Sequence, residues 1–348
     1  METRKYYQGV DALKFIAVIA IVLFHYADHG LTDLRTADLS YNWLILGFLK
    51  LGGGIGNCLF IMITGFLSVK RKFDARSVLK LWLQVFIASV VSQAVYCLVS
   101  GSMPGLKNLV KTFFPFTFNV YWYFSSYIVI YLLMPFINTM IDSIGQKKHK
   151  QIIGFSIILF SVIPTFTTTK WLTGINQIAM MIALYIVGSY CRKYSVSFGK
   201  KTLISCMALS ISFLLVSEYV IRRFSSFDPF YFAWEMNKTP VVVFAVSLFL
   251  LVVNSNIYVT AMIKRVSKHA FGIYLIHIGW ISPLLFEKVF ANDKLYETPM
   301  MIVQIIGYLI AVLVVCVFID YIYNILYNKI AAGIVDEIGK KMNEKLHT

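Results

Sequence analysis

The sequence is poor in charged residues and lacks the common motifs of soluble hydrolases. Only 14% of the 348 residues are charged, well below the roughly 25% that is usual in soluble domains. No GxSxG, HExxH or Walker loop occurs, and no paired carboxylates. Serine, zinc and nucleotide hydrolysis therefore lack support. What remains is a very apolar chain, 58% hydrophobic, which indicates an integral membrane protein.

Cysteines and linker sequences are also scarce. The five cysteines lie singly within or at the ends of apolar segments, without CxxC spacing, so neither a disulfide framework nor a zinc site is indicated. They are Cys58, Cys97, Cys191, Cys206 and Cys316. Because no linker rich in proline, glycine or serine interrupts the chain, we expect one membrane domain over residues 1–330. Residues 331–348 are expected to form a cytoplasmic amphipathic tail.

The basic residues outnumber the acidic ones and give a net charge of +15. In a soluble protein this excess would suggest a nucleic-acid partner. Here the lysines and arginines lie in short clusters between apolar runs, where membrane topology explains them. We therefore expect the lipid bilayer, and not a nucleic acid, as the first partner of the chain.

Apolar runs of the length needed to cross a bilayer recur along the whole chain. A hydrocarbon core about 30 Å thick requires about 20 helical residues, and scanning for such runs predicts ten spans. They are 10–28, 43–69, 79–100, 119–139, 151–166, 174–191, 202–222, 239–255, 269–287 and 299–327. The second span contains Gly52, Gly53, Gly54 and Gly56, and we expect these glycines to divide it into two pieces.

The connections between the spans divide the basic residues unevenly. With the N-terminus placed inside, one side receives 21 lysines and arginines and the other receives 9. This asymmetry predicts an even number of spans with both termini in the cytoplasm. The expected fold is an all-α bundle of about ten transmembrane helices in the cell membrane.

The first span carries three ionisable residues, Asp11, Lys14 and His25. Charged groups are costly inside a membrane, so each marks a candidate site. At 100° per residue, Lys14 and His25 lie only about 20° apart around the helix axis, and Asp11 lies about 40° from His25. The rise along the helix nevertheless separates Lys14 from His25 by about 16 Å, so the two cannot form a direct pair. The structural alternative is an interfacial Asp11–Lys14 salt bridge and a packing histidine.

Further polar residues lie in the later spans. His277 follows Tyr274 by three residues, so both can point into the bundle, although His277 also fits a packing role. Asn57 and Thr64, seven residues apart, share a face of the second span. Glu218 and Asp320 are interpreted as packing or interfacial groups. A histidine general base is the chemistry that the sequence leaves open.

Four segments together resemble membrane-bound acyltransferase family 3. The first span resembles that family's opening signature, with Lys14, ten residues and His25 where the family has arginine, ten residues and histidine. Leu59 to Leu67 is similar to its FFxxSGFL segment, with Thr64 in the serine place. The stretch from Tyr121 to Pro135, which contains Trp122, resembles its WF...YLxxP segment, and Gly272 to His277 matches its GIYLxH segment.

The resemblance implies a cytoplasmic acyl-coenzyme A donor, usually acetyl-coenzyme A, and a hydroxyl acceptor on a carbohydrate. It also implies that the histidine of the first span is essential. Our hypothesis is that His25 is the general base, with Asp11 and Lys14 on the same helix face. Lys14 and the basic residues Arg71, Lys72 and Arg76 would draw the phosphates of the donor to the cytoplasmic mouth, and no metal is involved. Residues proposed for positioning or binding are Asn57, Thr64, Trp122, Tyr274 and His277.

Two other classes of function suit the same features. A transporter or flippase for a glycan or a lipid-linked sugar would also need polar residues along an intramembrane path. A membrane sensor would bind a ligand without turnover. Product mass separates these classes, because only an acyltransferase adds an acyl group to its acceptor.

Overall fold

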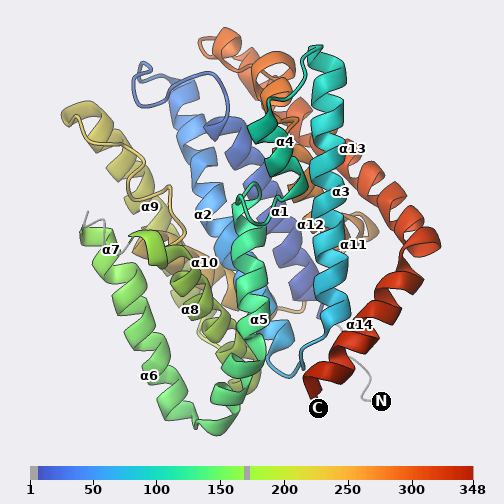
Figure 1. Cartoon of the computed structure of the whole chain (residues 1–348). Coiled ribbons are helices and arrows are strands. Elements are labelled where there is room, and N and C mark those ends of the chain that lie inside the picture. The colour runs from blue at the N-terminus through green and yellow to red at the C-terminus, as the bar shows by residue number, and fades with distance from the viewer. Residues whose placement is uncertain (1–6, 168–172, 348) are drawn as a thin grey trace.

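The computed structural model describes residues 7–167 and 173–347 of the chain. Arg4, Lys5 and Lys170, which enter the charge comparison above, lie outside the described residues, as does the side chain of Leu346. Within the two described ranges the regular structure is helical throughout, and no strand occurs. Figure 1 shows the helices gathered into one bundle.

Fourteen α-helices are present in the described ranges, joined by turns and short irregular helices. The α-helices are α1 (Gln8–Asp28), α2 (Tyr41–Ser68), α3 (Ala75–Ser100), α4 (Leu106–Phe113), α5 (Trp122–Ser143), α6 (Gln146–Ile157), α7 (Ile163–Phe166), α8 (Thr173–Tyr194), α9 (Lys200–Phe224), α10 (Thr239–Val253), α11 (Ala261–Lys268), α12 (Ala270–Ile278), α13 (Met300–Ile330) and α14 (Ala332–His347). The irregular ones are the π-helices η1 (Ile158–Val162) and η3 (Leu284–Val289) and the 3₁₀-helix η4 (Asp293–Leu295).

Seven helices in the described part of the chain are long and apolar enough to cross a membrane. They are α1, α2, α3, α5, the continuous run from α6 through η1 to α7, α9 and α13. The predicted spans at 174–191, 239–255 and 269–287 correspond to α8, α10 and the α12–η3 region, which are not among the seven. At 15 residues α10 is shorter than a full crossing requires. The chain is a multi-pass membrane protein with at least these seven apolar helices.

The centre of the bundle is the close crossing of α1 and α2. A Cβ atom on Gly52 would lie 2.2 Å from the Ala20 carbonyl oxygen, and one on Gly56 would lie 2.9 Å from the Ala17 carbonyl oxygen. Only glycine allows the two backbones to approach this closely. The expected division of the second span is wrong, because α2 runs unbroken through all four glycines. The glycines serve interhelical packing instead.

We call the end of the bundle where α3 begins and α14 lies the proximal end, and the opposite end, where α1 ends and α2 begins, the distal end (Figure 1). At the proximal end α14 packs on the start of α3. The Asn343 side chain accepts a hydrogen bond from the Ala75 amide at 2.9 Å and donates one to Asp74 at 2.9 Å. Partial burial acts to raise the pKa of Asp74, but hydrogen bonds from Asn343, Arg76 and Ser77 outweigh it and hold the pKa below its ordinary value. The C-terminal helix is thereby joined to the bundle.

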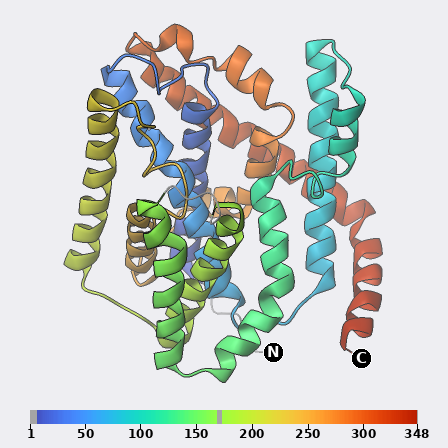
Figure 2. The ribbon, with the colours of Figure 1, turned by 60° about the vertical axis from the view of Figure 1, so that its left-hand side comes forward.

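Two irregular segments run from the distal end down to the middle of the bundle. After α3, the helix α4 folds back along it (Figure 2), and the ring centroids of Phe113 and Phe86 lie 6.3 Å apart. After α9, residues 225–238 descend until the Met236 carbonyl accepts a hydrogen bond from Cys58, which lies in the middle of α2. Irregular backbone at this depth is tolerated where it is buried in protein or lines a polar cavity. Both segments end beside the site described next.

Candidate active site

The two histidines singled out in the sequence meet in the structure. His25 lies in the last turn of α1, and His277 lies near the end of α12. Their Nδ1 and Nε2 atoms are 2.8 Å apart, and both side chains are buried, at 7% and 2% exposure. The packing of α12 against α1 thus joins residues 252 positions apart in the chain.

The backbone fixes which ring nitrogens of this pair carry protons. His277 Nδ1 lies 2.5 Å from the carbonyl oxygen of Ile273, which can only accept a hydrogen bond. In a neutral ring, His277 Nδ1 therefore carries the proton and His277 Nε2 is the acceptor. His25 Nδ1–H must then donate to His277 Nε2. This leaves His25 Nε2 unprotonated, the form that a general base needs.

His25 lines a cavity of about 640 Å³, which we call the distal cavity. Its wall combines aromatic rings with amides and carboxylates. The polar and aromatic residues in it include Phe24, Asp28, His29, Asn57, Asn119, Trp122, Tyr123, Trp234, Glu235, Asn237 and Tyr274. The His29 ring stacks on His25, with centroids 5.2 Å apart. The described residues contain no group of three or more His, Cys, Asp or Glu side chains arranged to hold a metal ion.

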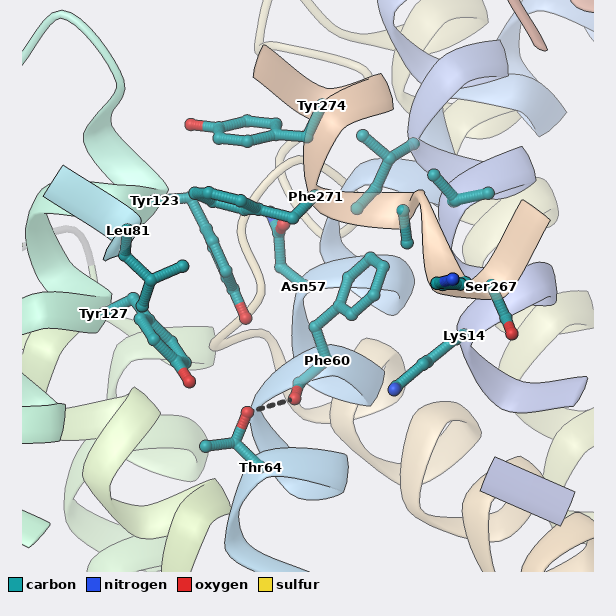
Figure 3. A pocket seen from close by; sticks show the side chains of 14 residues that line it. Lys14, Asn57, Phe60, Thr64, Leu81, Tyr123, Tyr127, Ser267, Phe271 and Tyr274 are labelled. Atoms are coloured by element: carbon teal, nitrogen blue, oxygen red, sulfur yellow. Dashed lines mark hydrogen bonds between the residues drawn. The ribbon is translucent and has the colours of Figure 1, made fainter. Parts of the chain in front are cut away.

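A second cavity, which we call the proximal cavity, begins at Lys14. It has a volume of about 240 Å³ and is lined by residues of α1, α2, α3, α5, α11 and α12. Figure 3 shows the Lys14 amine and the hydroxyl groups of Thr64, Tyr123 and Tyr127 directed toward the same space. The Thr64 hydroxyl donates to the Phe60 carbonyl at 2.9 Å. The cavity is mostly apolar, with its cationic groups at one end.

The two cavities meet at a shared wall. Ile21, Asn57, Tyr123 and Tyr274 line both of them. Ile21 lies between Lys14 and His25 on α1, so the face predicted from the helix geometry borders first one cavity and then the other. Lys14 and His25 are roughly 16 Å apart along this helix.

The structure places the remaining predicted residues in different surroundings. Trp122 and Tyr274 line the distal cavity, while Asn57 lines both cavities and Thr64 the proximal one. Asp11 lines neither cavity, and one of its oxygens accepts a hydrogen bond from Ser267 Oγ at 2.9 Å.

The basic loop residues lie apart from both cavities. Arg71, Lys72 and Arg76 line neither of them and are exposed at the proximal surface. Arg76 is paired with Asp74, at 3.0 Å between Nε and Oδ1. In this structure the loop cluster and the proximal cavity are therefore separate features.

Three cavity residues were not singled out from the sequence. Asn237 is 5% exposed and its Oδ1 has no hydrogen-bond partner within the described residues, and the same is true of the buried Tyr123 hydroxyl. Lys268 lines the proximal cavity. In the sequence, Asn237 comes after a segment predicted to be an external loop, and Tyr123 belongs to a run of aromatic residues. Lys268 resembles the basic residues that set membrane topology. Only the folded arrangement brings them to the cavities.

A buried cluster of polar side chains lies next to the segment that carries Ser267 and Lys268 into the proximal cavity. His269 Nδ1 lies 2.6 Å from Asp320 Oδ2, and both side chains are almost completely buried. Gln84 and Asn324 donate further hydrogen bonds to the same carboxylate, at 2.8 and 3.0 Å. Asp320, interpreted from sequence as a packing or interfacial group, thus connects α3, α13 and the junction of α11 and α12. The cluster fixes the point where Ser267 and Lys268 enter the cavity.

A comparison with protein families gives one result that covers this whole arrangement. The acyltransferase domain of family 3 matches residues 7–321, which include both cavities and both histidines. The chain belongs to this acyltransferase family. The resemblance seen in the four sequence segments is confirmed, and the protein is a membrane acyltransferase. A search of curated proteins finds no match, and a search of solved structures finds none.

Proposed function

We propose that this acyltransferase moves an acyl group, most simply acetyl, from a cytoplasmic acyl-coenzyme A to a hydroxyl of a carbohydrate. The acceptor is a surface polysaccharide or its lipid-linked repeat unit. The observation that carries the proposal is the position of His25, which lines a cavity that adjoins the one containing Lys14. A base in one of two adjoining cavities is suited to a reaction between two substrates.

The proposal includes a topology. Residues 1–330 form one domain that crosses the cell membrane ten times. The seven long helices provide seven crossings, and α8, α10 and the α12–η3 region provide the other three. Both termini and the tail 331–348 lie in the cytoplasm. The charge asymmetry between the two sets of loops supports this orientation. The proximal cavity then faces the cytoplasmic donor, and the distal cavity faces the outside.

His25 and His277 divide the work of the proton transfer. His25 Nε2 removes the proton of the acceptor hydroxyl as the hydroxyl oxygen attacks the thioester carbonyl. The positive charge that develops on His25 is stabilised by His277 Nε2, which already accepts from His25 Nδ1. When the carbon–sulfur bond breaks, the proton passes from His25 to the leaving thiolate. The products are an ester and free coenzyme A, and no metal takes part.

The walls shared by the two cavities are where the reacting groups meet. Asn57 and Tyr274 line both cavities, so their polar groups are available to the tetrahedral oxyanion or to the acyl chain. Trp122, beside them in the distal cavity, offers a flat apolar face for an acceptor ring. The unpartnered amide oxygen of Asn237 and the carboxylate of Glu235 suit an acceptor with several hydroxyl groups.

The first prediction concerns His25. His25→Ala is expected to lower acyl transfer by a factor on the order of 10²–10⁴, because the general base is lost. Surface glycan from cells with the wild-type protein, the variant or no protein is compared by mass spectrometry and NMR. The acyl increment should be present only with the wild type.

The control for this experiment is His149→Phe, which removes an imidazole of α6 that lines neither cavity. It is expected to keep most of the transfer. Both variants are first shown to accumulate as folded protein. Full transfer by folded His25→Ala would overturn the assignment of the base.

The two adjoining cavities, with polar residues in both walls, also fit a flippase for a lipid-linked sugar. In that case the acceptor would change sides without a change in mass. The same mass comparison therefore separates the two functions.

A further inference from the structure

The proximal cavity contains two lysines from different helices. Lys14 belongs to α1, and Lys268 is the last residue of the neighbouring helix α11. Lys14 is partly buried, whereas Lys268 is exposed. The two residues are 254 positions apart in the chain, and the cavity is what they share.

Neither lysine is neutralised within the cavity. Within the described residues neither forms an ion pair or a side-chain hydrogen bond, and no Asp or Glu lines the cavity. Asp11, the nearest carboxylate on α1, lies outside the lining, accepts a hydrogen bond from Ser267 and acts on Lys14 only through its charge, without a direct ion pair. A cavity with two ammonium groups that form no direct ion pair, and with nearby hydroxyls, attracts an anion.

The position of Lys268 is built into the fold. The next residue, His269, is held by Asp320 at 2.6 Å, and the preceding residue, Ser267, is held by Asp11 at 2.9 Å. The chain on both sides of Lys268 is therefore fixed, while its own side chain is left without a partner. A lysine needed only for topology requires no such support, since any exposed position near the membrane surface would serve.

The basic loop after α2 has a different arrangement. Arg76 is paired with Asp74 and lies outside the cavity, as do Arg71 and Lys72. These residues contribute to the positive potential of the proximal surface, but they do not reach the path toward His25. The geometry distinguishes them from the two lysines of the cavity.

We propose that Lys268 joins Lys14, to which the sequence hypothesis already assigns the donor phosphates, in a two-lysine site that binds the phosphate groups of the acyl-coenzyme A donor. The proposal rests on the proposed function for the identity of the donor. With the phosphates held at this end, the pantetheine arm extends between Asn57 and Tyr123 toward His25. By holding the phosphates, Lys268 then determines how far the thioester reaches toward His25.

The test measures the binding of free coenzyme A to the full-length protein in lipid nanodiscs by calorimetry. Lys268→Ala is expected to raise the Kd for coenzyme A by about tenfold, as loss of one charge-assisted phosphate contact implies. Lys14→Ala should act in the same direction, and Lys268→Arg should bind like the wild type. Pantetheine, which has no phosphate groups, is the second probe and should be insensitive to Lys268→Ala.

Arg265→Ala is the matched control. Arg265 is exposed on the same short helix and carries the same charge, but it does not line the cavity. A Lys268→Ala protein that binds coenzyme A as tightly as Arg265→Ala overturns the proposal. Equal weakening of coenzyme A and pantetheine also overturns it, because the effect would not depend on phosphate.

Two further outcomes are kept distinct. If Lys268→Ala does not accumulate as folded protein, Lys268→Gln, which keeps a long polar side chain, is measured in its place. If the wild-type protein binds no coenzyme A, the donor in the proposed function is wrong, and with it the proposed ligand of the two-lysine site. Binding by the wild type with no effect at Lys268 refutes only the role of Lys268.

Discussion

At the scale of single residues, one backbone carbonyl determines the protonation pattern of the candidate site. The Ile273 carbonyl accepts a hydrogen bond from His277 Nδ1, so His277 Nε2 accepts one from His25 Nδ1. His25 Nε2 then carries no proton. A similar order occurs in catalytic triads, where a third group holds the histidine in the correct tautomer. Here a second histidine fills that place. Under the proposed mechanism, His277 is therefore a positioning residue that acts through His25.

This role predicts a specific kinetic effect. In His277→Phe the acceptor for His25 Nδ1–H is lost, and kcat is expected to fall on the order of 10²-fold. The KM for the donor should change little, because the phosphates bind far from this pair. His277→Gln, whose amide oxygen can accept the same hydrogen bond, should recover part of the rate. Steady-state kinetics on purified protein measures both, and an unchanged kcat in His277→Phe would refute the relay.

The sequence identified part of this site and missed the rest for a physical reason. His25 and His277 stood out because imidazoles are rare and costly inside apolar spans. Lys268 and Asn237 did not, because a lysine at a span end and an asparagine in a loop are ordinary there. Their importance depends on tertiary contacts, such as the His269–Asp320 pair, which no local pattern encodes.

At the scale of elements, glycines determine how closely the helices of the core approach. The crossing of α1 and α2 depends on Gly52 and Gly56, and the crossing of α2 and α8 on Gly65 and Gly188. A Cβ atom on Gly65 would lie 2.0 Å from the Tyr185 carbonyl oxygen. Asn57 of α2 lines both cavities, so the glycine contacts of α2 also affect the position of the wall between them.

Gly52→Ala tests this packing. The added methyl group meets the Ala20 backbone, so a loss of stability of about 1–3 kcal/mol is expected. Gly307→Ala in α13 is the matched control, because nothing lies within 4 Å of its added Cβ. There alanine should stabilise the helix by up to about 1 kcal/mol. Thermal unfolding in detergent compares the two, and equal melting temperatures for both variants would contradict the packing role.

Most predicted spans agree closely with helices of the structure, but the prediction of one span over 269–287 is wrong, because α12 ends at Ile278 and a turn separates it from η3. Among the spans that agree, α9 covers 200–224 where 202–222 was predicted, and α10 covers 239–253 where 239–255 was predicted. The depth of the helices does not follow from sequence either. A hydropathy pattern predicts where an apolar helix lies in the sequence, but it does not show whether that helix reaches both membrane surfaces. The descent of residues 225–238 to the level of Cys58 is a tertiary feature, and it explains why α10 is short.

At the scale of the whole molecule, the proposed topology assigns the two cavities to opposite sides of the membrane. Glu235→Cys in the distal cavity and Lys268→Cys in the proximal cavity are introduced into a protein without its five native cysteines. Both positions are exposed. A membrane-impermeant maleimide added to intact cells should label the first and not the second, and inverted vesicles should give the reverse result. Labelling of both from one side would refute the topology.

The wall between the two cavities has a consequence for the membrane itself. Tyr123 and Tyr274 line both cavities, so under this topology the barrier between cytoplasm and exterior is locally about one aromatic side chain thick. Two water-soluble molecules can then touch across the membrane without either one being carried through it. Such an enzyme needs no alternating inward and outward states. Such a thin barrier could let small molecules and ions leak through the protein. In the proposed topology the rings of Tyr123 and Tyr274 block this leakage.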